Sequence, residues 1–88
     1  MPGQSLAEAC QTVRLRNDTS KELKLWLEPL GDAVILRPNL LCDLSATDDF
    51  GQVEIEVSED GFVVYGWVTR IISVDEDGKE HVEWELPA

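Results

Sequence analysis

The sequence predicts an all-β fold, an antiparallel β-sandwich or small barrel of seven to eight short strands. Apolar residues alternate with polar ones along several short segments, and Gly, Pro, Asn and Asp cluster between them. No segment has the apolar spacing of an amphipathic helix. With 88 residues, the chain has room for one core. We therefore expect one sandwich domain over residues 10–88, preceded by a flexible leader at residues 1–9.

The first two strands are predicted on either side of a polar turn at residues 17–20. Residues 12–16 alternate apolar with charged side chains, which is typical of a strand with one solvent-exposed face. Residues 22–28 place three leucines on one face and Trp26 on the other. Pro29 ends this second strand because it has no amide hydrogen for a β-ladder.

Three further segments are expected to be strands. Residues 33–36 form a short apolar run, and residues 40–44 resume the alternation with Leu40, Cys42 and Leu44 facing inward. Cys42 is therefore expected to be a small buried hydrophobe. Residues 52–57 place Val, Ile and Val on one face and Gln, Glu and Glu on the other.

The C-terminal third is predicted to contain a central strand and a hairpin. Residues 62–68 are apolar on both faces, which favours either a central strand covered on both sides or one whose outer face is a contact surface, with a bulge at Gly66. An Asp-Gly pair at residues 77–78 then separates two β-type segments and predicts a hairpin. In its last strand we expect Val82, Trp84 and Leu86 inward, with the glutamates between them outward.

The charge of the chain is strongly negative and unevenly distributed. Its formal net charge is −11, and residues 48–88 hold twelve acidic residues against two basic ones. Such a charge disfavours nucleic acid and anionic membranes as partners, and it favours a basic protein surface. Alternatively, the acidity serves only to keep a small domain in solution. We find no membrane-spanning apolar run and no signal peptide, so a cytoplasmic location is expected.

Residues suited to catalysis or metal binding are few. His81 is the single histidine, and no recognisable motif places a nucleophile beside it. Cys10 and Cys42 are too far apart in sequence for a zinc motif, and they could form a disulfide only if their strands are neighbours. The sequence therefore predicts a protein that is not an enzyme and that binds neither a metal nor a cofactor.

Exposed aromatic and acidic side chains are better candidates for a functional site. Trp26, and Trp67 with Tyr65, are expected opposite the main apolar stripe, where they form either a contact surface or a core covered by a second layer. The outward glutamates of two strands would form one negative patch if those strands are neighbours. The candidate binding residues are Trp26, Glu28, Tyr65, Trp67, Glu54, Glu56, Glu83 and Glu85.

A motif of the form L-x-L-E-P-x-G-D occupies residues 25–32, followed by Leu-Arg-Pro at 36–38 and Val-Val-Tyr-Gly-Trp at 63–67. With the Asn-ending strand before it, this pattern resembles a family of small uncharacterised bacterial proteins over residues 12–68. The resemblance implies a bacterial, cytoplasmic β-domain and no particular activity. Asn39 stands where the family more often has Gly, and Asn can replace Gly because it tolerates positive φ.

The function that these features favour is a non-enzymatic protein-interaction module that engages a basic partner. A sandwich that binds a small ligand or a carbohydrate is the first alternative, with the aromatic side chains as stacking platforms. An acidic inhibitor or immunity-type protein is the second, because an acidic domain can neutralise a basic one.

Overall fold

The computed structural model describes residues 11–59 and 61–87, which form eight strands and no helix. The expected leader at residues 1–9 and the Cys10 position lie outside the described residues. The strands are β1 (Gln11–Arg16), β2 (Leu23–Glu28), β3 (Asp32–Leu36), β4 (Leu41–Thr47), β5 (Glu54–Ser58), β6 (Gly61–Tyr65), β7 (Trp67–Val74) and β8 (Glu80–Glu85). This confirms the prediction of an all-β fold with short strands.

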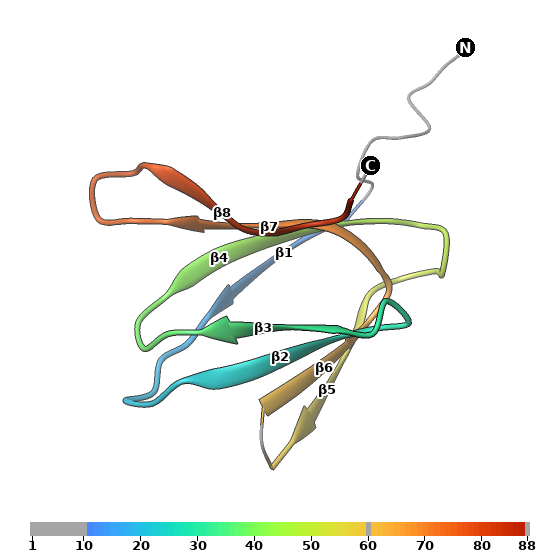
Figure 1. The fold of residues 1–88 in the computed structure, drawn as a ribbon, viewed down its shortest axis with the longest axis horizontal. Helices are drawn as coiled ribbons and strands as arrows, with labels where there is room; N and C mark the ends of the chain where they lie inside the picture. Colours follow the sequence, from blue (N-terminus) through green and yellow to red (C-terminus); the bar gives the residue numbers. More distant parts are fainter. Residues whose placement is uncertain (1–10, 60, 88) are drawn as a thin grey trace.

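The strands form two four-stranded sheets that pack face to face as a sandwich (Figure 1). One sheet has the order β1-β4-β7-β8 and is antiparallel throughout. The other has the order β3-β2-β6-β5 and is mixed, because β2 and β6 run parallel. The prediction of purely antiparallel strands is wrong for this pair. Each of the two strands belongs to a local hairpin, and only packing of the two hairpins brings them together.

Gly66 separates two strands where the sequence predicted one. β6 ends at Tyr65 and β7 begins at Trp67, and the two strands belong to different sheets. The segment is apolar on both faces because β6 contributes Val64 to the core from one sheet and β7 contributes Val68 from the other. A Cβ atom at position 66 would lie 3.1 Å from a methyl carbon of Val53, so a glycine suits this crossover.

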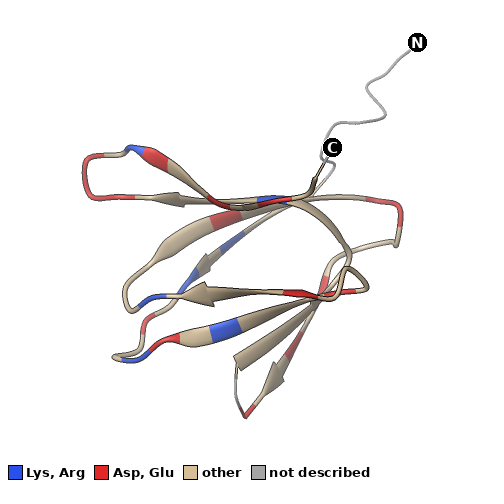
Figure 2. Cartoon of the chain, in the orientation of Figure 1, with Lys and Arg blue, Asp and Glu red and all other residues tan. Residues whose placement is uncertain are grey.

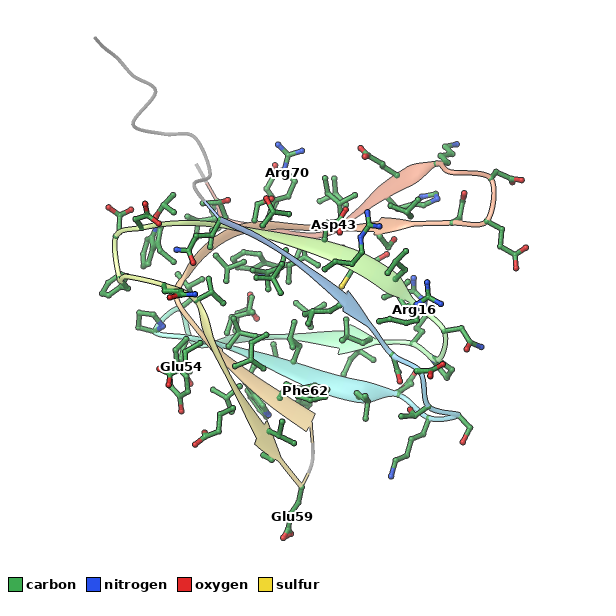
Figure 3. All side chains as sticks on the ribbon, turned by 180° about the vertical axis from the view of Figure 1, so that it is seen from behind. Arg16, Asp43, Glu54, Glu59, Phe62 and Arg70 are labelled. Atoms are coloured by element: carbon green, nitrogen blue, oxygen red, sulfur yellow. The ribbon has the colours of Figure 1, made fainter. Side chains whose placement is uncertain are left out.

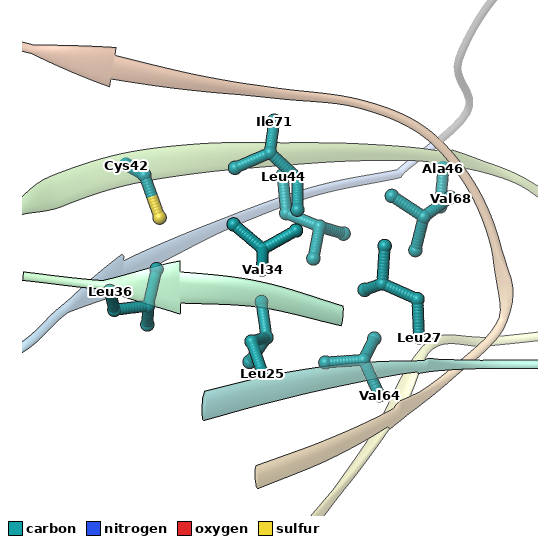
Figure 4. Packing of buried hydrophobic residues seen from close by; sticks show 10 residues of the cluster. All are labelled: Leu25, Leu27, Val34, Leu36, Cys42, Leu44, Ala46, Val64, Val68 and Ile71. Atoms are coloured by element: carbon teal, nitrogen blue, oxygen red, sulfur yellow. The ribbon is translucent and has the colours of Figure 1, made fainter. Parts of the chain in front are cut away.

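The core lies between the two sheets and consists of aliphatic residues with one cysteine (Figure 4). Its members are Leu25, Leu27, Val34, Leu36, Cys42, Leu44, Ala46, Val64, Val68 and Ile71. The predicted inward faces of β2 and β4 are therefore confirmed. Cys42 is fully buried, as expected, and burial raises the pKa of its thiol to about 11.

Two valines that were expected inside are exposed. Val57 on β5 is 75% exposed because the β5–β6 hairpin projects away from the antiparallel sheet and leaves its tip uncovered (Figure 1). Val82 on β8 is 58% exposed. The pairing of β7 with β8 shifts register between Ile71 and Ile72, so the alternation that the sequence predicted is broken within β8. Val82, paired with Ile72, faces outward, whereas Trp84, paired with the core residue Ile71, packs against the core as expected.

Asn17, just after β1, is a buried polar residue with a complete set of partners. Its side-chain Nδ2 donates hydrogen bonds to the carbonyl oxygens of Leu36 at 2.8 Å and Lys21 at 2.9 Å. Its Oδ1 accepts hydrogen bonds from the backbone amide of Thr19 at 3.0 Å and from its hydroxyl at 2.7 Å. One side chain thereby fixes the β1–β2 turn and attaches it to the end of β3.

The backbone of Asn17 extends this network to the β3–β4 turn. Its amide donates to the carbonyl oxygen of Leu40, and its own carbonyl accepts from the amide of Asn39. Asn39 has a φ of 65°, the left-handed conformation that Asn tolerates well. Both turns that carry the chain between the sheets at this end therefore depend on one residue.

Replacing Asn17 with Ala is expected to lower the free energy of unfolding by about 2–4 kcal/mol, because buried carbonyl and amide groups lose their partners. Asn17→Asp keeps the shape and the acceptor but loses both donors, and it too is expected to be destabilised. Urea denaturation of the three proteins measures the effect. Wild-type stability in the Asp variant would contradict the role assigned to the two donated bonds.

Gly61 begins β6 where the strand passes very close to β2. Its φ is +146°, and a Cβ atom there would overlap the backbone oxygen of Lys24. Gly61→Ala is therefore expected to lower the free energy of unfolding by about 3 kcal/mol. Gly78 is the matched control, since its φ is +82° and nothing lies within 4 Å of an added Cβ. Gly78→Ala should cost about 1 kcal/mol, and equal losses in thermal denaturation would rule out the close approach as the cause.

Candidate functional site

The outer face of the mixed sheet brings aromatic and acidic side chains into adjacent rows. On β2 and β6, Trp26 is paired with Val63 and Glu28 with Tyr65. On the other side of β6, Tyr65 is paired with Glu54 of β5. Tyr65 therefore lies between Glu28 and Glu54 on the neighbouring strands. The Trp26–Val63 pair lies two residues further along the strands, on the same face of the sheet. This arrangement joins four of the predicted binding residues.

A groove with a volume of about 760 Å³ opens on this face. Trp26 and Tyr65 are its main aromatic walls, and they are 39% and 41% exposed. The groove is lined by Trp26, Glu28, Pro29, Phe50, Gln52, Glu54, Val63, Tyr65 and Gly66. The question that the sequence left open for Trp26 is thus answered: its ring belongs to the surface and not to the core.

Phe50 and Trp67 form a pair at one end of the groove. Their ring centroids are 5.4 Å apart, with an angle of 35° between the rings. Phe50 is largely exposed and lines the groove, whereas Trp67 is half-buried and is absent from the lining. Trp67 therefore contacts a groove residue and supports it from the side of the antiparallel sheet.

Gln11 holds the loop between β4 and β5, which supplies two of the groove residues. Its side-chain nitrogen lies within hydrogen-bond distance of the carbonyl oxygens of Thr47 and Gly51 and of a carboxylate oxygen of Asp48. Its side-chain oxygen accepts a hydrogen bond of 2.7 Å from the amide of Val53. Sequence analysis missed this residue, because its partners lie 36 to 42 positions away and no local pattern links them.

The carboxylates around Tyr65 create a negative field in and beside the groove. The phenol donates a hydrogen bond of 3.0 Å to Glu56 on β5. This hydrogen bond is the largest cause of the raised pKa of Tyr65, and the negative charge of Glu56 is the second. The charges of Glu28 and Glu54 raise the pKa further. Figure 2 shows acidic positions on β5 and at its tip, with basic positions on β1 and β2.

A cation already lies against one aromatic wall. The ammonium nitrogen of Lys24 is 4.6 Å from the ring centroid of Trp26. The negative face of an indole ring attracts cations in this geometry. One face of the Trp26 ring is therefore occupied by a cation of the chain itself, in the geometry that a partner cation would use.

Glu83 and Glu85 do not join the groove. They lie on β8 of the antiparallel sheet, whereas Glu54 and Glu56 lie on β5 of the mixed sheet. The condition for a single patch of the four glutamates, that their strands are neighbours, is therefore not met. Alternation identifies the face of a strand and not its neighbour.

Glu83 also points inward, contrary to expectation, because of the register shift in β8. Its carboxylate accepts a 2.6 Å hydrogen bond from the hydroxyl of Ser73 and pairs at 3.2 Å with Arg37, beyond the end of β3. Its side chain is 14% exposed. The hydrogen bond from Arg37 is the largest cause of a lowered pKa of the carboxyl group, and the hydrogen bond from Ser73 is the second. Glu85 is an exposed residue paired with Arg70.

The one histidine lies outside the groove, and the described residues contain neither a metal-binding cluster nor a membrane-spanning helix. His81 is exposed at the end of the β7–β8 hairpin, with its Nε2 3.0 Å from a carboxylate oxygen of Asp75. Within residues 11–59 and 61–87, no group of three or more His, Cys, Asp or Glu residues could hold a metal ion. The same residues include no helix long and apolar enough to cross a membrane.

Comparisons with protein-family models, with curated proteins and with solved structures find no match for this chain. The case for a function therefore depends on the groove itself, on its two aromatic walls and on the three carboxylates around Tyr65.

Tyr65 is the single tyrosine of the chain, so its titration can be followed by phenolate absorbance. We expect its pKa to lie above the ordinary value of 10.0 and to fall toward it in Glu56→Gln. Because the pKa of Tyr65 is raised in the folded state, its hydrogen bond to Glu56 stabilises the fold fully at pH values below the pKa of an unfolded tyrosine. This stabilisation is lost as the pH rises through the pKa of Tyr65 in the folded protein. The wild-type protein should therefore lose more stability above pH 10 than Glu56→Gln does. Glu85→Gln, on the other sheet, should leave the titration unchanged, and a wild-type pKa in Glu56→Gln would refute the assigned contact.

Proposed function

We propose that this protein is a non-enzymatic protein-interaction module whose groove on the mixed sheet binds a basic segment of a partner. The observation that carries the proposal is the placement of two exposed aromatic rings beside three carboxylates on one face. The rings are those of Trp26 and Tyr65, and the carboxylates are those of Glu28, Glu54 and Glu56.

Lys and Arg side chains have the chemistry that this face complements. Their apolar stems can lie on an aromatic wall while their charged ends reach a carboxylate. An exposed cation–π contact contributes about 0.5–1 kcal/mol, so several contacts of this kind are needed for useful affinity. The position of Lys24 over Trp26 supports this mode of contact. The net charge of −11 would also attract a basic partner over distance and speed association.

The size and polarity of the groove favour a short segment over a folded surface or a sugar. Its volume of about 760 Å³ fits a few side chains. Its charged lining residues, Glu28 and Glu54, are both acidic, which suits a cation better than a neutral carbohydrate. An inhibitor or immunity role would use the same surface and would be recognised by loss of the activity of the bound partner.

The test is titration of a fluorescent lysine- and arginine-rich peptide, followed by anisotropy. We expect binding at about 0.1 M salt and its loss at about 1 M, where the Debye length falls from about 10 Å to about 3 Å. Trp26→Ala and the double variant Glu28→Gln/Glu54→Gln should each weaken binding about tenfold, equivalent to about 1.4 kcal/mol.

Glu80→Gln/Glu85→Gln is the matched control for the double variant, because it removes the same two charges from β8 on the other sheet. Equal weakening by this control would mean that net charge alone attracts the peptide, and the groove would lose its role. A change in tryptophan fluorescence on addition of neutral oligosaccharides, without peptide binding, would favour the carbohydrate alternative.

A further inference from the structure

β5 forms an open edge of the mixed sheet beside the groove. In the part of the chain that the structure describes, β5 pairs with β6 alone, and that pairing is regular along Glu54–Ser58. An edge strand has unpaired amide and carbonyl groups that can accept another strand, and proteins usually protect such edges with charged side chains, above all Lys, with Pro or with a bulge. The β5 sequence, EIEVS, contains no Lys and no Pro, and its pairing has no bulge. Its charged residues are both glutamates, which oppose an acidic strand and attract a basic one.

The other three edges differ from β5 in their pairing or their charge. β8 is irregular in its pairing with β7. Its Trp84 donates a 2.7 Å hydrogen bond to Asp32 at the start of β3, so side chains join these two edges across the sandwich. β1 carries two arginines, which would repel a basic strand. β5 thus combines a regular pairing with acidic side chains beside the groove, which suits a basic strand.

The two faces of β5 differ in chemistry. Glu54 and Glu56 face outward beside the groove, while Ile55 and Val57 face the inner side. Val57 is 75% exposed because the hairpin tip extends beyond the opposite sheet. Figure 3 shows Glu54 near one end of this hairpin and Glu59 at its projecting tip. A strand placed beside β5 would therefore meet acidic side chains on one face and apolar ones on the other.

We propose that the partner contributes, beside the segment in the groove, an extended strand in which basic and apolar residues alternate, and that this strand adds to β5 at the edge of the mixed sheet. This inference rests on the proposed function of the groove. Directly opposed side chains in a sheet lie about 5 Å apart, so alternate basic residues would face Glu54 and Glu56. The intervening apolar residues would cover Val57, and the backbone would satisfy the open edge of β5.

A second copy of this chain fits less well. β1 does alternate basic with apolar residues, as such a partner requires. However, each copy has a net charge of −11, and Arg14 is already engaged by Asp43. The charge thus favours a different, basic protein.

The probe is a synthetic peptide of alternating lysine and valine with blocked termini. Its control is a block peptide with the same lysines followed by the same valines, and a second control is the alternating peptide with every backbone amide N-methylated. We expect the alternating peptide to bind about tenfold more tightly than either control. Val57→Thr should weaken the alternating peptide about threefold and leave the block peptide unaffected.

Amide hydrogen exchange, measured by NMR on the full chain, reads the backbone contact directly. Strand addition should slow exchange at every second amide of β5, because only alternate amides face the open edge. If the alternating peptide binds no better than its N-methylated form and β5 amides gain no protection, strand addition is wrong while the groove proposal stands. If no lysine-containing peptide binds at all, both proposals fail.

Discussion

The hydrogen bonds of buried Asn17 hold together the two turns on which the arrangement of the sheets depends. Its side chain joins the β1–β2 turn to the end of β3, and its backbone reaches the β3–β4 turn. At both turns the chain passes from one sheet to the other, as it does again between β4 and β5 and between β6 and β7. Because they are fixed, β2 lies at the centre of the mixed sheet with its leucines in the core and Trp26 outside.

The two sides of the sandwich are joined in different ways, and this difference determines where a partner can bind. Trp84 with Asp32, and Glu83 with Arg37, connect the sheets through side chains on the β3–β8 side. Near β5 the connection is Gln11, which fixes the loop before the strand and leaves the hairpin tip uncovered. The groove and an open edge therefore lie side by side, both within reach of the carboxylates of β5.

Local patterns predicted the parts of the fold that depend on one strand at a time. Alternation in β2 and β4 identified the core leucines and Cys42, and the Asp-Gly pair identified the β7–β8 hairpin. The same alternation placed Trp26, Glu28 and Glu54 outward, and all three line the groove together with the predicted Tyr65. Each of these features follows from the two-residue period of a strand and from turn chemistry.

The sequence by itself determined that the chain forms short strands, which side chains of β2 and β4 face inward and that the charge is acidic. Only the tertiary structure decided which strands are neighbours: it placed β6 parallel to β2, separated Glu83 from Glu54, and brought Gln11 to the loop before β5. The physical reason is that periodicity specifies the face of a strand, whereas pairing is decided by packing between segments far apart in the chain. The groove lies across β2, β6 and β5, and no local pattern connects β2 with the β5–β6 hairpin.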